Sequence, residues 1–274
     1  MSAQEDKLTN SLEALARVED DIDVVEKEVE IIRLRKMAPL YELRGKAITG
    51  VDGFWKVVLS QHSDFANYVR AADLKYIDCI KSIEMKWMCL EDNKLDHRNV
   101  AISFEFDGID GDFEAQIVTK YFKIENDITK FKYTGKRTEE DDLRDGELGF
   151  LTSEPCQIKW PKSFNNINPS LVSDKSTAEG KKNYRTGMKS FFSWFKWTGL
   201  KVGKEFPNGD GLANLLADDI YPNCTKYYTE AQVDLEDENI DDEDLSNGPI
   251  ELESSGSGSD ENPKNEPEHK KRKI

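Results

Sequence analysis

Residues 8–32, LTNSLEALARVEDDIDVVEKEVEII, decide the fold of this 274-residue chain. Apolar side chains recur every seven residues at one position and again three residues further along, in the series Leu8, Leu15, Ile22, Val29 and the series Val18, Val25, Ile32. Charged residues fill most positions between them, so the apolar stripe is narrow and typical of helix pairing. Since no second helix of this kind follows, we predict that the stripe pairs with a second copy. Packing against the chain's own domain is the alternative.

The helical pattern continues beyond this stretch. Pro39 interrupts it, but residues 40–44 resume helical character, which predicts a kinked continuation rather than an end. Gly50 and Gly53 mark a boundary. A second helix is expected from Phe54 and a third over residues 65–75.

The middle of the chain is predicted to be a sheet. Ile102, Phe104 and Phe106 alternate with polar residues, which indicates a strand. Residues 107–112, DGIDGD, form a predicted turn to a second strand over 113–124. The turn is not a calcium loop, because Ile109 replaces a ligand and no glutamate closes it. Further strands are expected at 129–133 and at 157–160, before Pro161.

Three segments follow the predicted sheet. Residues 173–190 are rich in Lys, Ser, Thr, Gly and Asn, which favours a loop that is either solvated or used for a phosphate contact or for docking. The aromatic run FFSWFKW at 191–197 is expected to pack helices onto one face of the sheet. Leu212, Leu215, Leu216 and Ile220 have helical spacing, and Pro222 is expected to end their helix.

The charge is segregated along the chain. The formal net charge is −16; residues 227–274 carry 15 acids and 5 bases, whereas residues 1–226 carry 39 and 33. Such an acidic tail cannot bury a core and suits a basic partner. Residues 1–226 are also net acidic, so direct binding to duplex DNA is expected to be at most weak, because duplex binding requires basic side chains against phosphates. No apolar run approaches the ~20 residues of a membrane span, and no signal peptide is expected.

The usual enzyme motifs do not match. Residues 199–205, GLKVGKE, are one residue short of a P-loop and have Glu205 in place of Ser or Thr. The four cysteines are far apart and no histidine pair lies near them, so we expect neither a zinc site nor a cofactor. The sequence predicts a non-enzyme.

Several motifs together carry a family resemblance. They are GFW at 53–55, KYFKI at 120–124, IKW at 158–160, SFFSWF at 190–195, DDIYPN at 218–223 and the tyrosine pair 227–228. With the acidic tail, they make the chain resemble the nucleosome assembly protein family of histone chaperones, and within it the SET-like branch.

The resemblance implies an α+β fold. A long N-terminal dimerisation helix (1–50) would precede an antiparallel-sheet domain with helices on one face (51–228), and a disordered acidic tail (229–274) would follow. Two copies would join through antiparallel helices into a headphone-shaped homodimer. The dimerisation residues would be those of the heptad stripe: Leu8, Leu15, Val18, Ile22, Val25, Val29 and Ile32.

The resemblance further implies a function. The concave, acidic underside of the domain and the tail would bind core histones, the H3–H4 pair or the 2A–2B pair, and promote nucleosome assembly and disassembly. Gly211 and Lys196 depart from the family's acidic pattern there. The histone-binding residues predicted on this basis are Glu205, Asp210, Asp218, Asp219, Asp234, Glu236, Asp237, Glu238, Asp241, Asp242, Glu243 and Asp244, with bracing of a helix as the alternative for Asp219.

Two further partners are predicted. The scaffold alternative to chaperoning has the chain present histones to a modifying enzyme such as an acetyltransferase. The basic cluster Lys270, Lys271, Arg272 and Lys273 at the end of the acidic tail is read as a nuclear import signal, which implies an importin and the nucleus. Two other interpretations of that cluster are a solubilising charge run and an internal role, in which it folds back on the acidic stretch and inhibits it.

Overall fold

The structure is a computed structural model that describes residues 3–132 and 149–244. Side-chain surroundings are described for residues 7–132 and 149–233. The first compact unit of the chain spans Met1–Val233, and the packing below lies within it.

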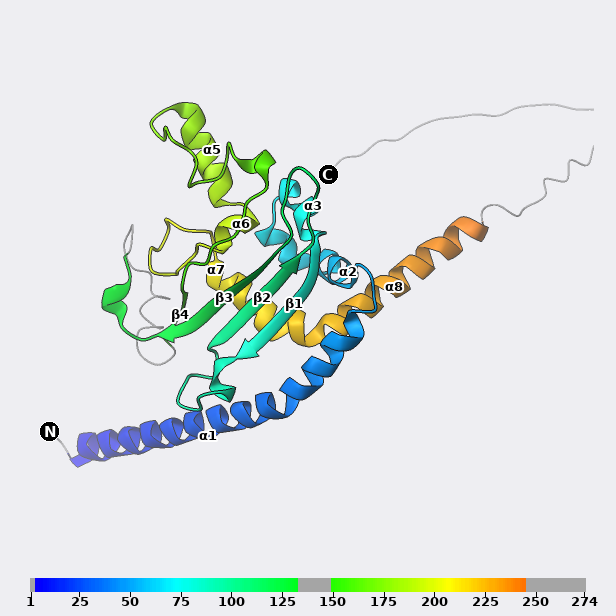
Figure 1. Cartoon of the computed structure of the whole chain (residues 1–274). Helices are drawn as coiled ribbons and strands as arrows, with labels where there is room; N and C mark the ends of the chain where they lie inside the picture. Colours follow the sequence, from blue (N-terminus) through cyan, green and yellow to red (C-terminus); the bar gives the residue numbers. More distant parts are fainter. Residues whose placement is uncertain (1–2, 133–148, 245–274) are drawn as a thin grey trace, which may run out of the picture. The chain divides into compact units, whose positions relative to one another are not determined.

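Helix α1 runs without a break from Ala3 to Ile48, with Pro39 inside it (Figure 1). The predicted continuation through Pro39 is therefore confirmed. The first part of α1 is exposed, while Leu34 and Tyr41 are buried against the domain. The predicted boundary after it is also confirmed, because Gly53 has a φ of +69° and α2 (Phe54–Gln61) begins directly behind it.

The expected third helix is broken into short turns. Two 3₁₀ helices, Ser63–Tyr68 and Ala71–Asp73, precede the four-residue α3 (Leu74–Ile77). The break follows from Asp73, a fully buried carboxylate. It accepts hydrogen bonds from the backbone N–H groups of Arg70 and Phe191, and so ties the turn to a distant segment instead of a regular helix.

Within the described residues, four strands form one antiparallel sheet in the order β1–β2–β3–β4. Their bounds are β1 Ile80–Trp87, β2 Val100–Phe106, β3 Gln116–Glu125 and β4 Phe150–Ser153. The predicted hairpin between β2 and β3 is confirmed, and Phe104 lies opposite Val118 in its register. Strand β1 was not predicted.

Two predicted strands are wrong. Residues 128–130 form a 3₁₀ turn instead of the strand expected at 129–133, because the Asp127 carboxylate accepts the Thr129 N–H at 3.0 Å and favours a turn. Tyr133 lies outside the described residues. Residues 157–160 form no strand, because the side chain of Gln116 in β3, rather than its backbone, bonds the Lys159 N–H and carbonyl, at 2.8 and 2.9 Å.

The core lies between the inner face of the sheet and the aromatic motif. Phe191, Phe192, Trp194 and Phe195, at and just beyond the short helix α6 (Phe191–Trp194), are fully buried. They meet Phe104 at the centre of the sheet, with ring centroids 5.6 to 6.0 Å apart for three of the four. Such edge-to-face contacts are favourable for aromatic rings. The predicted packing of helices on one face is confirmed, with α6 and α7 (Gly209–Asn214) behind the sheet in Figure 1.

The expected loop over 173–190 is instead largely helical. Helix α5 (Ala178–Met188) begins at Thr177, whose hydroxyl caps it by accepting the Gly180 N–H at 3.0 Å. Gly180 and Gly187 are buried, which allows the helix backbone to lie directly against neighbouring backbone. The loop prediction failed because composition does not register such close contacts.

The C-terminal helix also differs from the prediction. A π-helical segment, Leu215–Ile220, leads directly into α8 (Tyr221–Asp244), so Pro222 does not end a helix. Proline is tolerated there because the π-helical turn already interrupts the regular hydrogen-bond ladder. Helix α8 continues past the boundary expected after Tyr228, as far as Asp244. The disorder expected for the acidic tail stays a prediction. In the described part of the chain, no helix is both long and apolar enough to cross a membrane.

Candidate functional site

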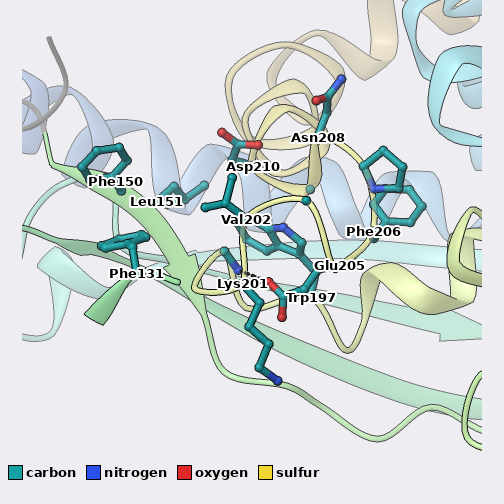
Figure 2. A pocket seen from close by; sticks show the side chains of 14 residues that line it. Phe131, Phe150, Leu151, Trp197, Lys201, Val202, Glu205, Phe206, Asn208 and Asp210 are labelled. Atoms are coloured by element: carbon teal, nitrogen blue, oxygen red, sulfur yellow. Dashed lines mark hydrogen bonds between the residues drawn. The ribbon is translucent and has the colours of Figure 1, made fainter. Parts of the chain in front are cut away.

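Two of the predicted carboxylates line one hollow. Glu205 and Asp210 lie in a cavity of about 400 Å³ between strand β4 and the loop that precedes α7 (Figure 2). Phe131, Phe150 and Trp197 form much of its apolar wall, and the Lys201 side chain extends away from the other labelled side chains in Figure 2. The structure therefore brings these two acids together.

Glu205 stabilises the loop that forms this hollow. Its carboxylate accepts the Thr198 hydroxyl at 2.7 Å and the Gly199 N–H at 2.9 Å. Gly199 has a φ of +78°, a conformation that favours glycine, and the Glu205 hydrogen bond holds the turn there. Because its oxygens are engaged in this turn, Glu205 is better placed to shape the surface than to bind a partner.

Asp210 lies in the first turn of α7 and is half-buried. The pKa of the Tyr68 hydroxyl is raised, first by burial and then by the negative charges of the neighbouring Asp210 and Asp64. The position expected to hold a second acid, Gly211, faces that hydroxyl so closely that an added Cβ would lie 2.6 Å from it. Any larger side chain at 211 would displace Tyr68.

Asp218 lines a different hollow. This cavity of about 500 Å³ lies between α1, the loop between β1 and β2, and the π-helical segment, and it also contains Glu30, Arg33 and His97. Glu30 is already paired with Arg33 at 2.7 Å. Burial, and then repulsion by Glu30, raises the pKa of the Asp218 carboxyl. Arg33 and His97 in the same cavity favour the charge of Asp218, but they do not outweigh these two effects.

Asp219 braces helix α8. It accepts hydrogen bonds from the Tyr227 hydroxyl at 2.7 Å and the Asn223 amide at 2.9 Å, and it lies 3.1 Å from His62 Nε2. Burial opposes ionisation of Asp219, but these hydrogen bonds outweigh it and lower the pKa of its carboxyl. Tyr227 responds in the opposite sense: burial and the bond to Asp219 raise its pKa to about 12. The bracing alternative for Asp219 describes this geometry.

Sequence reasoning missed two members of that cluster. His62 is buried and contacts the Tyr227 ring edge-on at 4.7 Å between centroids. His62 has no motif around it, and its sequence separation of 157 from Asp219 conceals the pairing. Tyr227 was named in the sequence analysis, but only as a member of the tyrosine pair 227–228 and not as a partner of Asp219.

Sequence reasoning also passed over a buried lysine. Lys120 is fully buried on the inner face of β3 and donates to the carbonyls of Phe195 and Trp197 at 3.2 and 2.7 Å. The signal was present, since Lys120 alternates in phase with Val118 and Phe122, both of which face the core.

The remaining predicted residues lie at the two ends of the chain. The eight acids from Asp234 to Asp244 lie in α8, and the basic cluster Lys270–Lys273 lies outside the described residues. On α1, every predicted seam residue is between 44% and 61% exposed. Four further apolar residues of α1 are similarly exposed but had not been assigned to the seam: Leu12, Val24, Leu40 and Leu43. One chain alone therefore leaves the heptad stripe uncovered.

The comparison with known families decides the identity of this fold. The family description "Nucleosome assembly protein (NAP)" matches residues 18–231. The chain belongs to the nucleosome assembly protein family. The match covers α1 from Val18 onwards, the sheet, the aromatic motif and the first part of α8, and it confirms the resemblance inferred from the motifs.

Relatives of this nucleosome assembly protein extend along nearly the whole chain. Vacuolar protein sorting-associated protein 75 of Saccharomyces cerevisiae is 49% identical over 95% of this chain and 94% of its own length. Protein SET of Drosophila melanogaster is 25% identical over 86% of this chain and 75% of its own, which agrees with the SET-like branch. The crystal structure of the Vps75 histone chaperone superposes with a TM-score of 0.71 at 49% identity, covering 82% of this chain and 99% of that one.

Proposed function

We propose that this protein is a histone chaperone that binds basic core histones and promotes nucleosome assembly and disassembly. The observation that carries the proposal is the match of the folded chain to the Vps75 histone chaperone at about half identity along nearly all of that structure. The segregation of acidic charge supports the proposal, since residues 227–274 carry −10 of the chain's net charge of −16.

The mechanism we propose is competition for the basic surface of histones. Histone–DNA affinity depends mainly on phosphate charge and weakens steeply with salt. A protein that covers the same surface with carboxylates removes non-specific histone–DNA contacts and leaves well-ordered wrapping favoured. The acidic residues of α8 would raise the capture rate by long-range attraction, and the folded surface would supply the geometry.

Within the folded surface, the four predicted carboxylates would have unequal roles. Asp218 is the strongest candidate for a direct histone contact, because a lysine or arginine would relieve the repulsion from Glu30. Asp210 is the second, at the edge of the other hollow. Glu205 and Asp219 would act through the loop and the helix that they hold.

Dimerisation is part of the proposal. Pairing through the exposed stripe of α1 would place two histone-binding surfaces in one particle. Because a second binding event is then intramolecular, the pair would hold a symmetric histone assembly more tightly than two separate chains would.

The test is a binding titration with each of the two core-histone pairs. We expect Asp218→Asn to weaken binding about three- to tenfold, and Asp210→Asn to weaken it less. The matched control is Asp110→Asn, an exposed acid on the β2–β3 turn that should change affinity less than twofold. Full affinity in a protein that carries both Asp218→Asn and Asp210→Asn would remove the folded surface from the proposal. No measurable binding of either histone pair by the unmodified chain would remove the chaperone function itself.

A scaffold function is the second candidate, favoured by a separate basic face on helix α5. In this function the protein would present histones to a modifying enzyme such as an acetyltransferase. A change in acetylation rate or in the choice of lysine on adding the protein would support it, whereas an unchanged acetylation pattern would count against it.

We further propose that the protein acts in the nucleus, without enzymatic activity of its own. The terminal cluster Lys270–Lys273 would be recognised by an importin. Replacing the four residues by alanine should shift a fluorescently tagged chain from the nucleus to the cytoplasm. Unchanged nuclear accumulation would exclude this signal.

A further inference from the structure

Helix α5 carries a stripe of basic side chains on a chain that is otherwise acidic. Lys181, Arg185 and Lys189 follow one another at intervals of four residues, and Lys182 lies beside them. Residues at this spacing share one face of a helix. With a rise of 1.5 Å per residue, the stripe is about 12 Å long. All four side chains are exposed.

These four residues have no acidic partner within the described part of the chain. Other lysines do: Lys81 pairs with Glu105 at 2.8 Å, and Lys130 pairs with Glu125 at 2.7 Å. From residue 175 to residue 204 there are eight basic residues and a single acid, Glu179. The stripe is therefore a region of unbalanced positive charge in a chain of net charge −16.

The stripe is also held in a fixed position. At Gly180, an added Cβ would lie 1.7 Å from the Asp174 carbonyl oxygen, and at Gly187 it would lie 1.8 Å from that of Ile167. The Ser193 hydroxyl, from the buried aromatic motif, donates to the Gly187 carbonyl at 2.7 Å. The inner side of α5 is thus packed backbone to backbone, while its outer side presents the basic residues. A rigid charged surface loses little conformational entropy on binding.

A shallow hollow runs along the stripe. It has a volume of about 420 Å³ and is lined by Ala178, Lys181, Lys182, Arg185, Thr186 and Lys189. Long basic side chains usually lay their aliphatic stems along the surface and keep their charged heads in water, so such a hollow offers both apolar stems and positive charge. Such a hollow suits a narrow, elongated anion.

We propose that this basic face of α5 binds a short segment rich in Asp and Glu on another protein. Arg185 would bind a carboxylate through two parallel N–H···O bonds, and the lysines would supply charge on either side. Basic residues would recognise this partner, whereas acidic residues would recognise histones. The protein would then hold a basic and an acidic partner on different surfaces at the same time.

An acidic protein segment fits this face better than duplex DNA does. A duplex is a long rod with one negative charge per ~1.7 Å of its axis. Beyond the ~12 Å stripe, its phosphates would face a chain with an excess of carboxylates. A short peptide ends where the stripe ends, and at physiological salt charges beyond about 8 Å are screened. The short anion therefore gains the attraction without the repulsion.

The experiment measures binding of a fluorescein-labelled 12-residue Asp/Glu peptide to the full chain by fluorescence anisotropy in 150 mM salt. We expect a chain with Lys181→Glu, Arg185→Glu and Lys189→Glu to bind the peptide at least tenfold more weakly. The matched control replaces Lys94, Lys123 and Lys162, three exposed lysines outside α5, by glutamate. It makes the same change in net charge and should bind the peptide within twofold of the unmodified chain.

Three outcomes would overturn the proposal. One is equal weakening by the control variant, which would show a response to total charge alone. Another is no peptide binding by the unmodified chain. The third is tighter binding of a 12-base-pair duplex than of the peptide, lost in the α5 variant, which would make α5 a DNA contact.

Folding and the chaperone function are checked on the same proteins. The α5 variant should keep its melting temperature and its affinity for core histones. Retained histone binding with lost peptide binding supports a separate surface. Lost histone binding with retained peptide binding would overturn the proposed histone surface and leave the α5 proposal standing.

Discussion

At the scale of single residues, Lys120 is the most unusual side chain in the core. It is fully buried and, among the described residues, forms no ion pair; its ammonium group is bound by the carbonyls of Phe195, Trp197 and Glu154. The rings of Phe122 and Trp194 lie 5.3 and 5.8 Å away and add cation–π attraction. Burial nevertheless disfavours the charge and lowers the pKa of Lys120 to about 8. The lysine thereby joins the centre of the sheet to the turn after the aromatic motif.

This gives a prediction for stability against pH. Below pH 8 the lysine is charged in both the folded and the unfolded chain, so the full cost of burying the charge is present. Between about pH 8 and 10.5 the unfolded chain holds more protons than the folded one, and stability rises with pH. A pKa lowered from 10.5 to about 8 corresponds to about 3 kcal/mol over that window. We expect the free energy of unfolding, relative to Lys120→Met, to rise by this amount.

The measurement is urea unfolding of both proteins at pH values from 7 to 10.5. Lys120→Met lacks the titrating group but keeps a side chain of similar length, so other titrations cancel in the difference. Parallel stability curves for the two proteins would show that the lysine has the same pKa folded and unfolded.

At the scale of elements, buried glycines decide how α5 is attached. The helix is polar and poor in apolar residues, so no broad hydrophobic face draws it to the domain. Its attachment depends on backbone contacts that a Cβ would prevent, at Gly180 and Gly187. The same residue type has no such role in α1, where Gly45 has no atom within 4 Å of an added Cβ.

Alanine at these two kinds of glycine should therefore have opposite effects. Gly187→Ala is expected to destabilise the protein by about 2 kcal/mol or more, because the new methyl group overlaps the Ile167 carbonyl. Gly45→Ala should stabilise it by about 0.5–1 kcal/mol, since glycine inside a helix loses more backbone entropy than alanine does. Thermal and urea unfolding measure both, and a destabilising Gly45→Ala would mean that its surroundings are filled by a partner.

The other element with a testable surface is α1. Leu15 and Val25 are 58% and 56% exposed, and their heptad positions predict that they are buried in a homodimer. Glutamate at both positions should convert a dimer to a monomer at about 10 µM, as measured by light scattering after gel filtration. The control replaces Leu171 and Ile117, which are 57% and 73% exposed outside α1, by glutamate and should leave the mass unchanged. A monomeric unmodified chain at this concentration would contradict the pairing.

At the scale of the whole molecule, charge is distributed unevenly along the sequence. The residues from Tyr227 onwards carry a net charge of −10, and the basic stripe of α5 lies in the part of the chain that precedes them. Exposed charges act over about a Debye length, so their effect on a basic partner depends on salt.

Neutralising the acids of α8 should therefore change the salt dependence more than the specificity. We expect replacement of the eight acids from Asp234 to Asp244 by their amides to flatten the plot of log affinity for core histones against log salt. Binding should weaken about tenfold near 100 mM salt without being lost. A chain with the same eight acids in scrambled order should keep the steep slope, and loss of that slope on scrambling would point to specific contacts.

Much of the fold was predictable because its signals are local. The β2–β3 hairpin follows from period-two alternation around Phe104 and a turn rich in Asp and Gly, and α2 follows from the glycines before it. Strand β1 was missed because a register shift between Ile80 and Ser82 places an extra residue in the strand and breaks the alternation. Strand β4 is only four residues long, too short for a pattern.

The candidate site was predictable only in part. The acids were found by composition and by the family motifs, but their surroundings were not. Asp218 and Asp219 are adjacent in sequence, yet one lies in a hollow with Glu30 and the other is hydrogen-bonded to Tyr227. Neighbours on a helix point in different directions, and what they meet comes from elements far away in the chain.

By itself, the sequence determined the family, the long helix with its uncovered apolar stripe, the hairpin, the aromatic core and the acidic charge of residues 227–274. These features depend on composition and on periods of two, three and a half, and seven residues, which local chain geometry imposes. Only the tertiary structure decided that the segment after 173 is a helix, that Pro222 lies within one, and which carboxylates are held internally. Those outcomes depend on packing contacts that no local pattern contains, from Gly187 against the Ile167 carbonyl to His62 with Asp219, 157 positions apart.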